Sequence, residues 1–139
     1  MSKPEIIIYT DGGARNNPGP AGAGVHIEDA HGKVLAEVSQ YLGERTNNWA
    51  EYEAVALALA KAKKLGLAGK KVEVRMDSEL VAKQLNGEYQ IKEESLHSQF
   101  VKVHNFTVKD FKNINFVHVR REQNAKADAL ANRAMDNGR

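Results

Sequence analysis

Cysteine is absent from this chain of 139 residues, and proline occurs only three times. Without thiols there is no disulfide framework, no thiol catalysis and no thiolate metal site. No apolar run is long enough to cross a bilayer, and the first five residues lack the layout of a signal peptide. We therefore expect a cytoplasmic protein without membrane contact. A Ser-centred nucleophile elbow, a Walker loop and a Gly-x-Gly-x-x-Gly fingerprint are also missing, so triad, P-loop and dinucleotide sites lack support.

Charge and composition are close to those of an ordinary folded domain. Hydrophobic residues make up 42% of the chain and charged residues 27%, which suits one domain over residues 1–139. The net charge of +2 permits nucleic-acid binding without requiring it. The basic residues form two groups, which either contact nucleic acid or form solvated faces and helix C-termini. They are Lys61, Lys63, Lys64, Lys70 and Lys71, then Arg120, Arg121, Lys126 and Arg133.

The hydrophobic pattern predicts three strands and then alternating helices and strands. The strands are expected at 6–11, 25–28, 34–42, 71–76 and 113–119, with the glycines of 21–24 beginning the second one. Helices are expected at 47–65, from just after Asp77 to Gly87, less regularly over 91–108, and at 124–135. The expected fold is α/β: a five-stranded mixed sheet, three strands antiparallel and two parallel, with helices on both faces.

Four acids stand at the ends of these elements and face the core side. Asp11 follows the apolar run Ile6–Tyr9, and Glu51 heads an apolar column near the start of its helix. Asp77 ends a strand, and Asp128 borders the apolar stripe of the last helix.

Each acid also has a purely structural interpretation. Asp11 could start an Asp-Gly turn, Glu51 and Asp128 could favour the helix dipole, and Asp77 could cap a helix. All four together are harder to explain this way, because neighbouring carboxylates repel one another and raise their pKa values. A divalent cation removes this objection. Oxygen ligands without Cys or His favour Mg²⁺ or Mn²⁺ over zinc, and the five histidines show no ligand spacing.

Four sequence blocks, in order and over nearly the whole chain, resemble type 1 ribonuclease H. They are Tyr9-Thr10-Asp11-Gly12-Gly13, Thr46-Asn47-Asn48-Trp49-Ala50-Glu51, Asp77-Ser78 and Asn124-Ala125-Lys126-Ala127-Asp128. The resemblance implies a ribonuclease H-like sheet and endonucleolytic cleavage of the RNA strand of an RNA–DNA hybrid to 5′-phosphate and 3′-hydroxyl products. It also implies two Mg²⁺ ions, replaceable by Mn²⁺, held by Asp11, Glu51, Asp77 and Asp128.

The resemblance also suggests which residues bind the substrate. Asn17, Asn47 and Asn48 match minor-groove contacts, where 2′-hydroxyls are displayed, and Thr46 matches a contact to a DNA phosphate. Gly12 is expected to let the ligand approach the backbone. Turn formation and helix capping would explain the polar residues equally well.

The sequence departs from the family in two places. The segment 88–112 has no Trp and little excess positive charge, so the basic protrusion of many members is absent. A loop histidine before the last acid is also missing, and His118 is expected inside a strand. Arg121, Glu122 and Asn124 are the candidates for an auxiliary role such as proton transfer or product release.

Two other functions compete with the nuclease hypothesis. A non-cleaving module could bind a hybrid or double-stranded RNA, although four carboxylates would oppose a phosphate. An actin-like ATPase would need two such domains, and this chain is too short. We expect a monomer whose partner is an RNA–DNA hybrid, with cleavage of double-stranded RNA left open by the unusual segment Arg120–Gln123.

Overall fold

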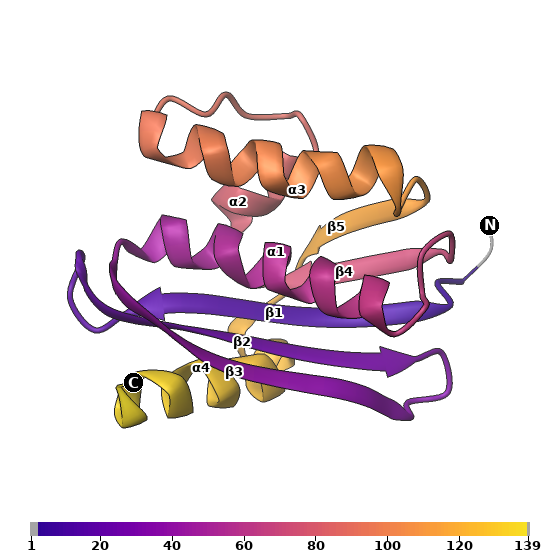
Figure 1. Cartoon of the computed structure of the whole chain (residues 1–139), viewed down its shortest axis with the longest axis horizontal. Coiled ribbons are helices and arrows are strands. Elements are labelled where there is room, and N and C mark those ends of the chain that lie inside the picture. Colours follow the sequence, from indigo (N-terminus) through magenta and orange to yellow (C-terminus); the bar gives the residue numbers. More distant parts are fainter. Residues whose placement is uncertain (1–2, 139) are drawn as a thin grey trace.

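The structure is a computed structural model that describes residues 3–138. Its strands form one sheet in the order β3-β2-β1-β4-β5 (Figure 1). They are β1 (Ile6–Ala14), β2 (Gly19–Asp29), β3 (Val34–Arg45), β4 (Val72–Met76) and β5 (Ile114–His118). β1 pairs antiparallel with β2 and β2 with β3, whereas β4 runs parallel to both β1 and β5. The predicted five-stranded mixed sheet is therefore confirmed.

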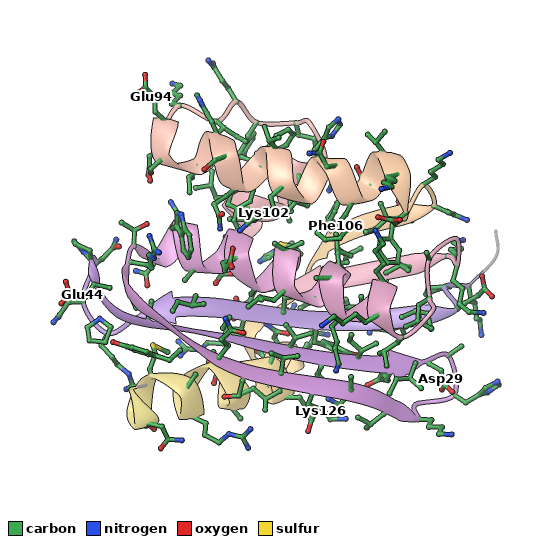
Figure 2. The ribbon with its side chains drawn as sticks, in the orientation of Figure 1. Asp29, Glu44, Glu94, Lys102, Phe106 and Lys126 are labelled. Carbon is green, nitrogen blue, oxygen red and sulfur yellow. The ribbon has the colours of Figure 1, made fainter. Side chains whose placement is uncertain are left out.

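Helices cover both faces of this sheet, as predicted. The α-helices are α1 (Asn47–Lys64), α2 (Glu79–Leu85), α3 (His97–Lys109) and α4 (Ala125–Asn137), and two short 3₁₀ helices are η1 (Glu94–Leu96) and η2 (Arg121–Asn124). α1 and α4 lie on opposite faces, and α3 packs on the outer side of α1 (Figure 1). Lys102 of α3 forms an ion pair with Glu53 of α1 at 2.5 Å (Figure 2). None of the helices in residues 3–138 is long and apolar enough to cross a membrane.

Glycine allows both α1 and α4 to approach the sheet closely around Asp11. A Cβ atom on Gly12 would lie 2.1 Å from the carbonyl oxygen of Ala50 in α1. Gly24 is the β2 residue that pairs with Asp11. A Cβ atom on Gly24 would lie 2.1 Å from the carbonyl oxygen of Ala127 in α4. The absent side chain of Gly12 therefore makes room for the backbone of α1, and the approach of a ligand to Gly12 stays a prediction.

Several strands and helices differ from their predicted bounds. β1 continues for three residues beyond Asp11, because its small residues pair with β2 as far as Ala14↔Ala21. Asp11 nevertheless lies just past Thr10↔Met76, the last pair between β1 and β4. The helix predicted over residues 91–108 begins later than expected, with η1 at Glu94 and α3 at His97. Leu80, expected on the inner side of α2, is 40% exposed.

Candidate active site

Four separate elements bring the four predicted acids into one cleft. Asp11 comes from β1, Glu51 from the second turn of α1, Asp77 from the end of β4 and Asp128 from the first turn of α4. All four line a cleft of about 500 Å³. One carboxylate oxygen each from Asp11, Glu51 and Asp77 lies within 4.8 Å of the other two.

The local structure weakens three of the structural interpretations of these acids. Asp11 is a paired strand residue and starts no turn. The cap of α2 is Ser78, whose Oγ accepts the Val81 N–H at 3.2 Å, so Asp77 does not cap it. Glu51 lies outside the first turn of α1, where the helix dipole acts most strongly. Only Asp128 does lie in a first turn.

Burial and mutual repulsion make the ionised cluster unfavourable on its own. Burial, together with the charges of Asp77 and Asp128, raises the pKa of Asp11 to about 8. Burial also raises the pKa of Glu51 well above its usual value, again assisted by Asp11 and Asp77. A hydrogen bond from the Gly12 N–H to Glu51 opposes this increase without cancelling it. The cluster therefore needs either bound protons or a cation.

The donor set of the cleft fits a divalent cation. Glu51 Oε2 is buried and has no hydrogen-bond partner among residues 3–138, although such an atom normally finds one. All the clustered ligands are carboxylate oxygens, which Mg²⁺ prefers. The one ion pair to these acids in the described part of the chain joins Arg121 and Asp128 at 3.8 Å, and Arg121 is 79% exposed. This long, exposed contact leaves the carboxylates available for a metal.

Of the predicted auxiliary residues, Arg121 alone lines the cleft. Glu122 is exposed and borders a separate hollow beside Tyr9 and Lys126. The two neighbours diverge because a 3₁₀ helix turns by about 120° per residue. Asn124 is fully buried, and its Nδ2 donates to the Thr10 carbonyl at 2.9 Å. It holds the start of α4 against β1, next to Asp11.

The predicted substrate residues hold each other in place at the edge of the cleft. Asn47 Oδ1 accepts the Ala14 N–H at 2.8 Å, and Asn17 Oδ1 accepts the Asn47 N–H at 2.9 Å. Thr46 caps α1 by accepting the Trp49 N–H at 3.2 Å. Asn17, Asn47 and Thr46 therefore do stabilise the loop and the start of α1. The amide NH₂ groups of Asn17 and Asn47, however, make no hydrogen bond within residues 3–138. Asn48 borders another hollow, with Leu80 and Tyr89.

Two basic cleft residues were missed at the sequence level. Arg15 follows β1, and His118 is the exposed last residue of β5, and both line the cleft with Arg120 and Arg121. His118 pairs with Met76, the residue before Asp77, so the predicted parallel strands could have indicated its position. By contrast, the group Lys61–Lys71 begins about 15 Å along α1 from Glu51, at 1.5 Å per residue.

Comparisons with known proteins agree with this fold and site. Residues 9–134 match the model of the reverse transcriptase-like family. Among solved structures, the chain is similar to LC11-RNase H1 isolated from compost, with 51% identity, a TM-score of 0.92 and coverage of 97% of this chain and 98% of that one. RNase H1 of the halophilic archaeon Halobacterium salinarum is 38% identical, with a TM-score of 0.88 and coverage of 95% and 98%.

A curated relative is longer. The bifunctional protein Rv2228c of Mycobacterium tuberculosis is 42% identical over 95% of this chain, which spans only 36% of that protein. LC11-RNase H1 has also been solved in complex with an RNA/DNA hybrid. The chain belongs to the type 1 ribonuclease H family.

Proposed function

We propose that the chain is a metal-dependent endonuclease that hydrolyses the RNA strand of RNA–DNA hybrids. The products are a 5′-phosphate and a 3′-hydroxyl. The observation that carries the proposal is the meeting of four carboxylates from four elements in one open cleft, with a buried Glu51 oxygen that lacks a partner. The family supports the substrate, since a relative with 51% identity has been solved with an RNA/DNA hybrid.

The carboxylates are assigned as ligands of two Mg²⁺ ions, with Mn²⁺ as a substitute. Asp11 would be a ligand of both ions, Asp128 would complete the ligands of the one that activates water, and Glu51 and Asp77 would hold the one at the leaving oxygen. Two such ions, when bound, stabilise the attacking and leaving oxygens of an in-line displacement. The protein keeps the ligands in place through the close contacts of Gly12 and Gly24 and through the Asn124–Thr10 bond.

The hybrid is recognised beside this cleft. The free NH₂ groups of Asn17 and Asn47 donate to acceptors in the minor groove, where RNA displays its 2′-hydroxyls. Thr46 and Asn48 are further contacts at the start of α1. Arg121, which lines the cleft, assists product release or proton transfer. A monomeric state and a cytoplasmic location stay predictions, and cleavage of double-stranded RNA stays open.

One assay separates this function from a non-cleaving binding module. End-labelled hybrid, RNA duplex and DNA duplex of the same sequence are incubated with Mg²⁺, with Mn²⁺ or with chelator. We expect cleavage of the RNA strand of the hybrid only with a metal ion. A shifted but intact hybrid with both metals would instead support the binding module. Asp11→Asn serves as the inactive control and Asp29→Asn, at the end of β2, as a matched change outside the cleft.

A further inference from the structure

Arg15 has an arrangement that the metal site and the minor-groove contacts do not explain. It follows β1 directly and lines the cleft together with the four carboxylates. Its guanidinium is fastened to α4 through one nitrogen: Nη2 bonds Asp136 Oδ1 at 2.5 Å, the Asn132 carbonyl at 3.3 Å and Asn132 Oδ1 at 3.4 Å. These contacts share the two hydrogens of Nη2 and tie the end of the side chain to α4, which limits the rotation of the planar group.

The rest of the guanidinium remains available. Nε and Nη1 of Arg15 have no hydrogen-bond partner within residues 3–138, and the side chain is 47% exposed. None of its contacts is to a carboxylate of the metal site, so its donors do not compete with a metal ion for Asp11 or Asp128. A rigid guanidinium with free N–H groups is suited to a phosphate, which accepts two parallel bonds from one arginine.

The position of Arg15 indicates which phosphate it meets. Along the backbone it stands between Asp11, at the metal site, and Asn17, at the proposed minor-groove contact. The neighbouring Ala14 N–H is bound by Asn47, so the chain here is held against the start of α1. A strand that enters the cleft and also reaches Asn17 and Asn47 passes this point with its phosphates.

We infer that Arg15 is a substrate-binding residue that contacts a backbone phosphate of the cleaved strand, next to the one that is hydrolysed. This inference rests on the proposed function, because it requires a nucleic-acid strand in the cleft. It also supplies a positive contact for a chain that lacks the basic protrusion. Asn132 connects the contact to the metal site, since its Nδ2 donates to the Asp128 carbonyl at 3.0 Å.

The test compares Arg15→Ala with Arg15→Lys, Asp136→Asn and Arg133→Ala. Arg133→Ala is the matched control, because it removes one positive charge from an exposed position of α4 outside the cleft. The KM for hybrid cleavage in Mg²⁺, kcat and the thermal midpoint are measured. The dissociation constant of the hybrid is measured in chelator over a range of sodium chloride concentrations.

We expect Arg15→Ala to raise KM about tenfold with a smaller change in kcat. The slope of the logarithm of the binding constant against the logarithm of the salt concentration should decrease by about one, which corresponds to one lost phosphate contact. Arg15→Lys should recover part of the affinity, since it restores the charge without the planar donors. Asp136→Asn and Arg133→Ala should keep the wild-type salt dependence.

A purely structural Arg15 gives a different result. In that case Arg15→Ala and Asp136→Asn lower the thermal midpoint alike, and the KM and salt dependence of Arg15→Ala equal those of the wild type. That outcome overturns the inference while wild-type cleavage of the hybrid continues. A wild-type protein that cleaves no hybrid overturns the proposed function instead, so the two failures are distinguishable.

Discussion

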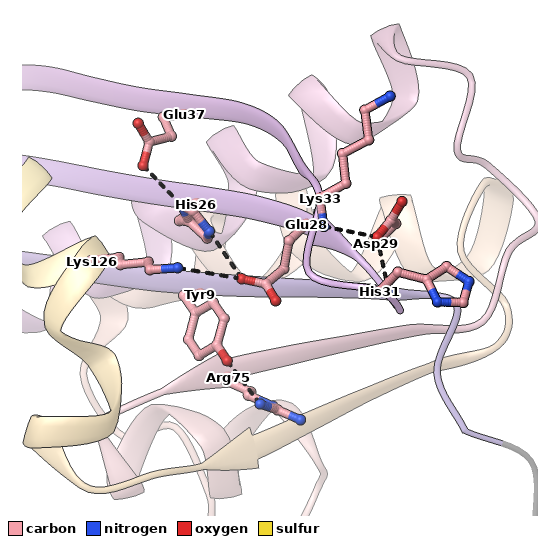
Figure 3. A network of polar contacts seen from close by, with 9 residues as sticks. All are labelled: Tyr9, His26, Glu28, Asp29, His31, Lys33, Glu37, Arg75 and Lys126. Carbon is pink, nitrogen blue, oxygen red and sulfur yellow. Dashed lines mark hydrogen bonds and ion pairs between the residues drawn. The ribbon is translucent and has the colours of Figure 1, made fainter.

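Two groups of acids lie on the same sheet, and only one of them is bridged by another side chain of the protein. Around His26, which is 1% exposed, the ring Nδ1 lies 2.8 Å from Glu37 and Nε2 lies 3.0 Å from Glu28 (Figure 3). The buried ring therefore connects the two carboxylates, one through each of its nitrogens. Lys126 of α4 adds a second, longer contact to Glu28 at 3.9 Å.

The acidic cleft has no equivalent of His26. Three of its carboxylates gather within 4.8 Å, and Arg121 reaches only the fourth, from an exposed position. The two sites differ in what completes them. The carboxylates of the His26 network have partners among the protein's own side chains, whereas the cleft requires protons or a cation from solution. The His26 network should therefore ignore Mg²⁺, and the cleft should depend on it.

The largest effect is expected for Asp11→Asn. Cleavage of the hybrid should fall by at least about a hundredfold, because the variant removes a charged ligand from the centre of the cluster. Stability in chelator should stay unchanged or rise slightly, since repulsion from Asp77 and Asp128 decreases. Gel assays of labelled hybrid and urea unfolding measure the two effects. A clear loss of stability without metal would contradict the assignment of Asp11 to a repulsive cluster.

The second prediction concerns the pH dependence of stability without metal. Because the folded state raises the pKa of Asp11 to about 8 and that of Glu51 upward, it binds more protons than the unfolded chain between about pH 4 and pH 8. The stabilisation is complete below this window and is lost as pH rises through it, on the order of 6 kcal/mol from Asp11. Mg²⁺ should reverse the loss. Urea unfolding at several pH values, with chelator and with Mg²⁺, checks this, and equal slopes in both would contradict it.

These charge arguments also show which parts of the site can be predicted from sequence. The four acids were found because each stands where a strand ends or a helix begins, and such ends gather at one edge of an α/β sheet. Their structural alternatives could be judged only from coordinates: whether Asp77 or Ser78 caps α2 depends on one hydrogen bond.

Other features depend on side-chain direction, which residue spacing does not determine. His118 reaches the cleft because β5 pairs in the register Met76↔His118, and a shift by one residue would turn it to the other face. Arg15 is held by α4, more than a hundred residues later in the chain. The second reason for a glycine at position 12, the approach of α1 at Ala50, cannot be inferred from the glycine alone.

The third prediction addresses the network of His26, Glu28 and Glu37. His26→Ala removes a buried ring together with its contacts to Glu28 and Glu37, and should lower the free energy of unfolding by about 2 kcal/mol. Mg²⁺ should not restore this loss, in contrast to its effect on the cleft. The double variant His26→Ala with Glu37→Gln should be less destabilised than the sum of the two single variants, because both changes remove the same contact. Recovery of His26→Ala by Mg²⁺ would remove the distinction between the two sites.

The smallest structural effect is expected for Arg121→Ala. Arg121 is 79% exposed and lies 3.8 Å from Asp128, so the ion pair contributes little and the thermal midpoint should not change. Because Arg121 still lines the cleft, removing it should alter turnover or hybrid affinity, and pre-steady-state kinetics would show whether product release is the affected step. Glu122→Gln is the matched control. Glu122 is the next residue in the chain but borders another hollow, so the kinetics of this variant should equal those of the wild type. If Arg121→Ala also matched the wild type in turnover and affinity, Arg121 would have no role in the reaction, and Arg15 would remain as the proposed cationic contact of the cleft with the substrate.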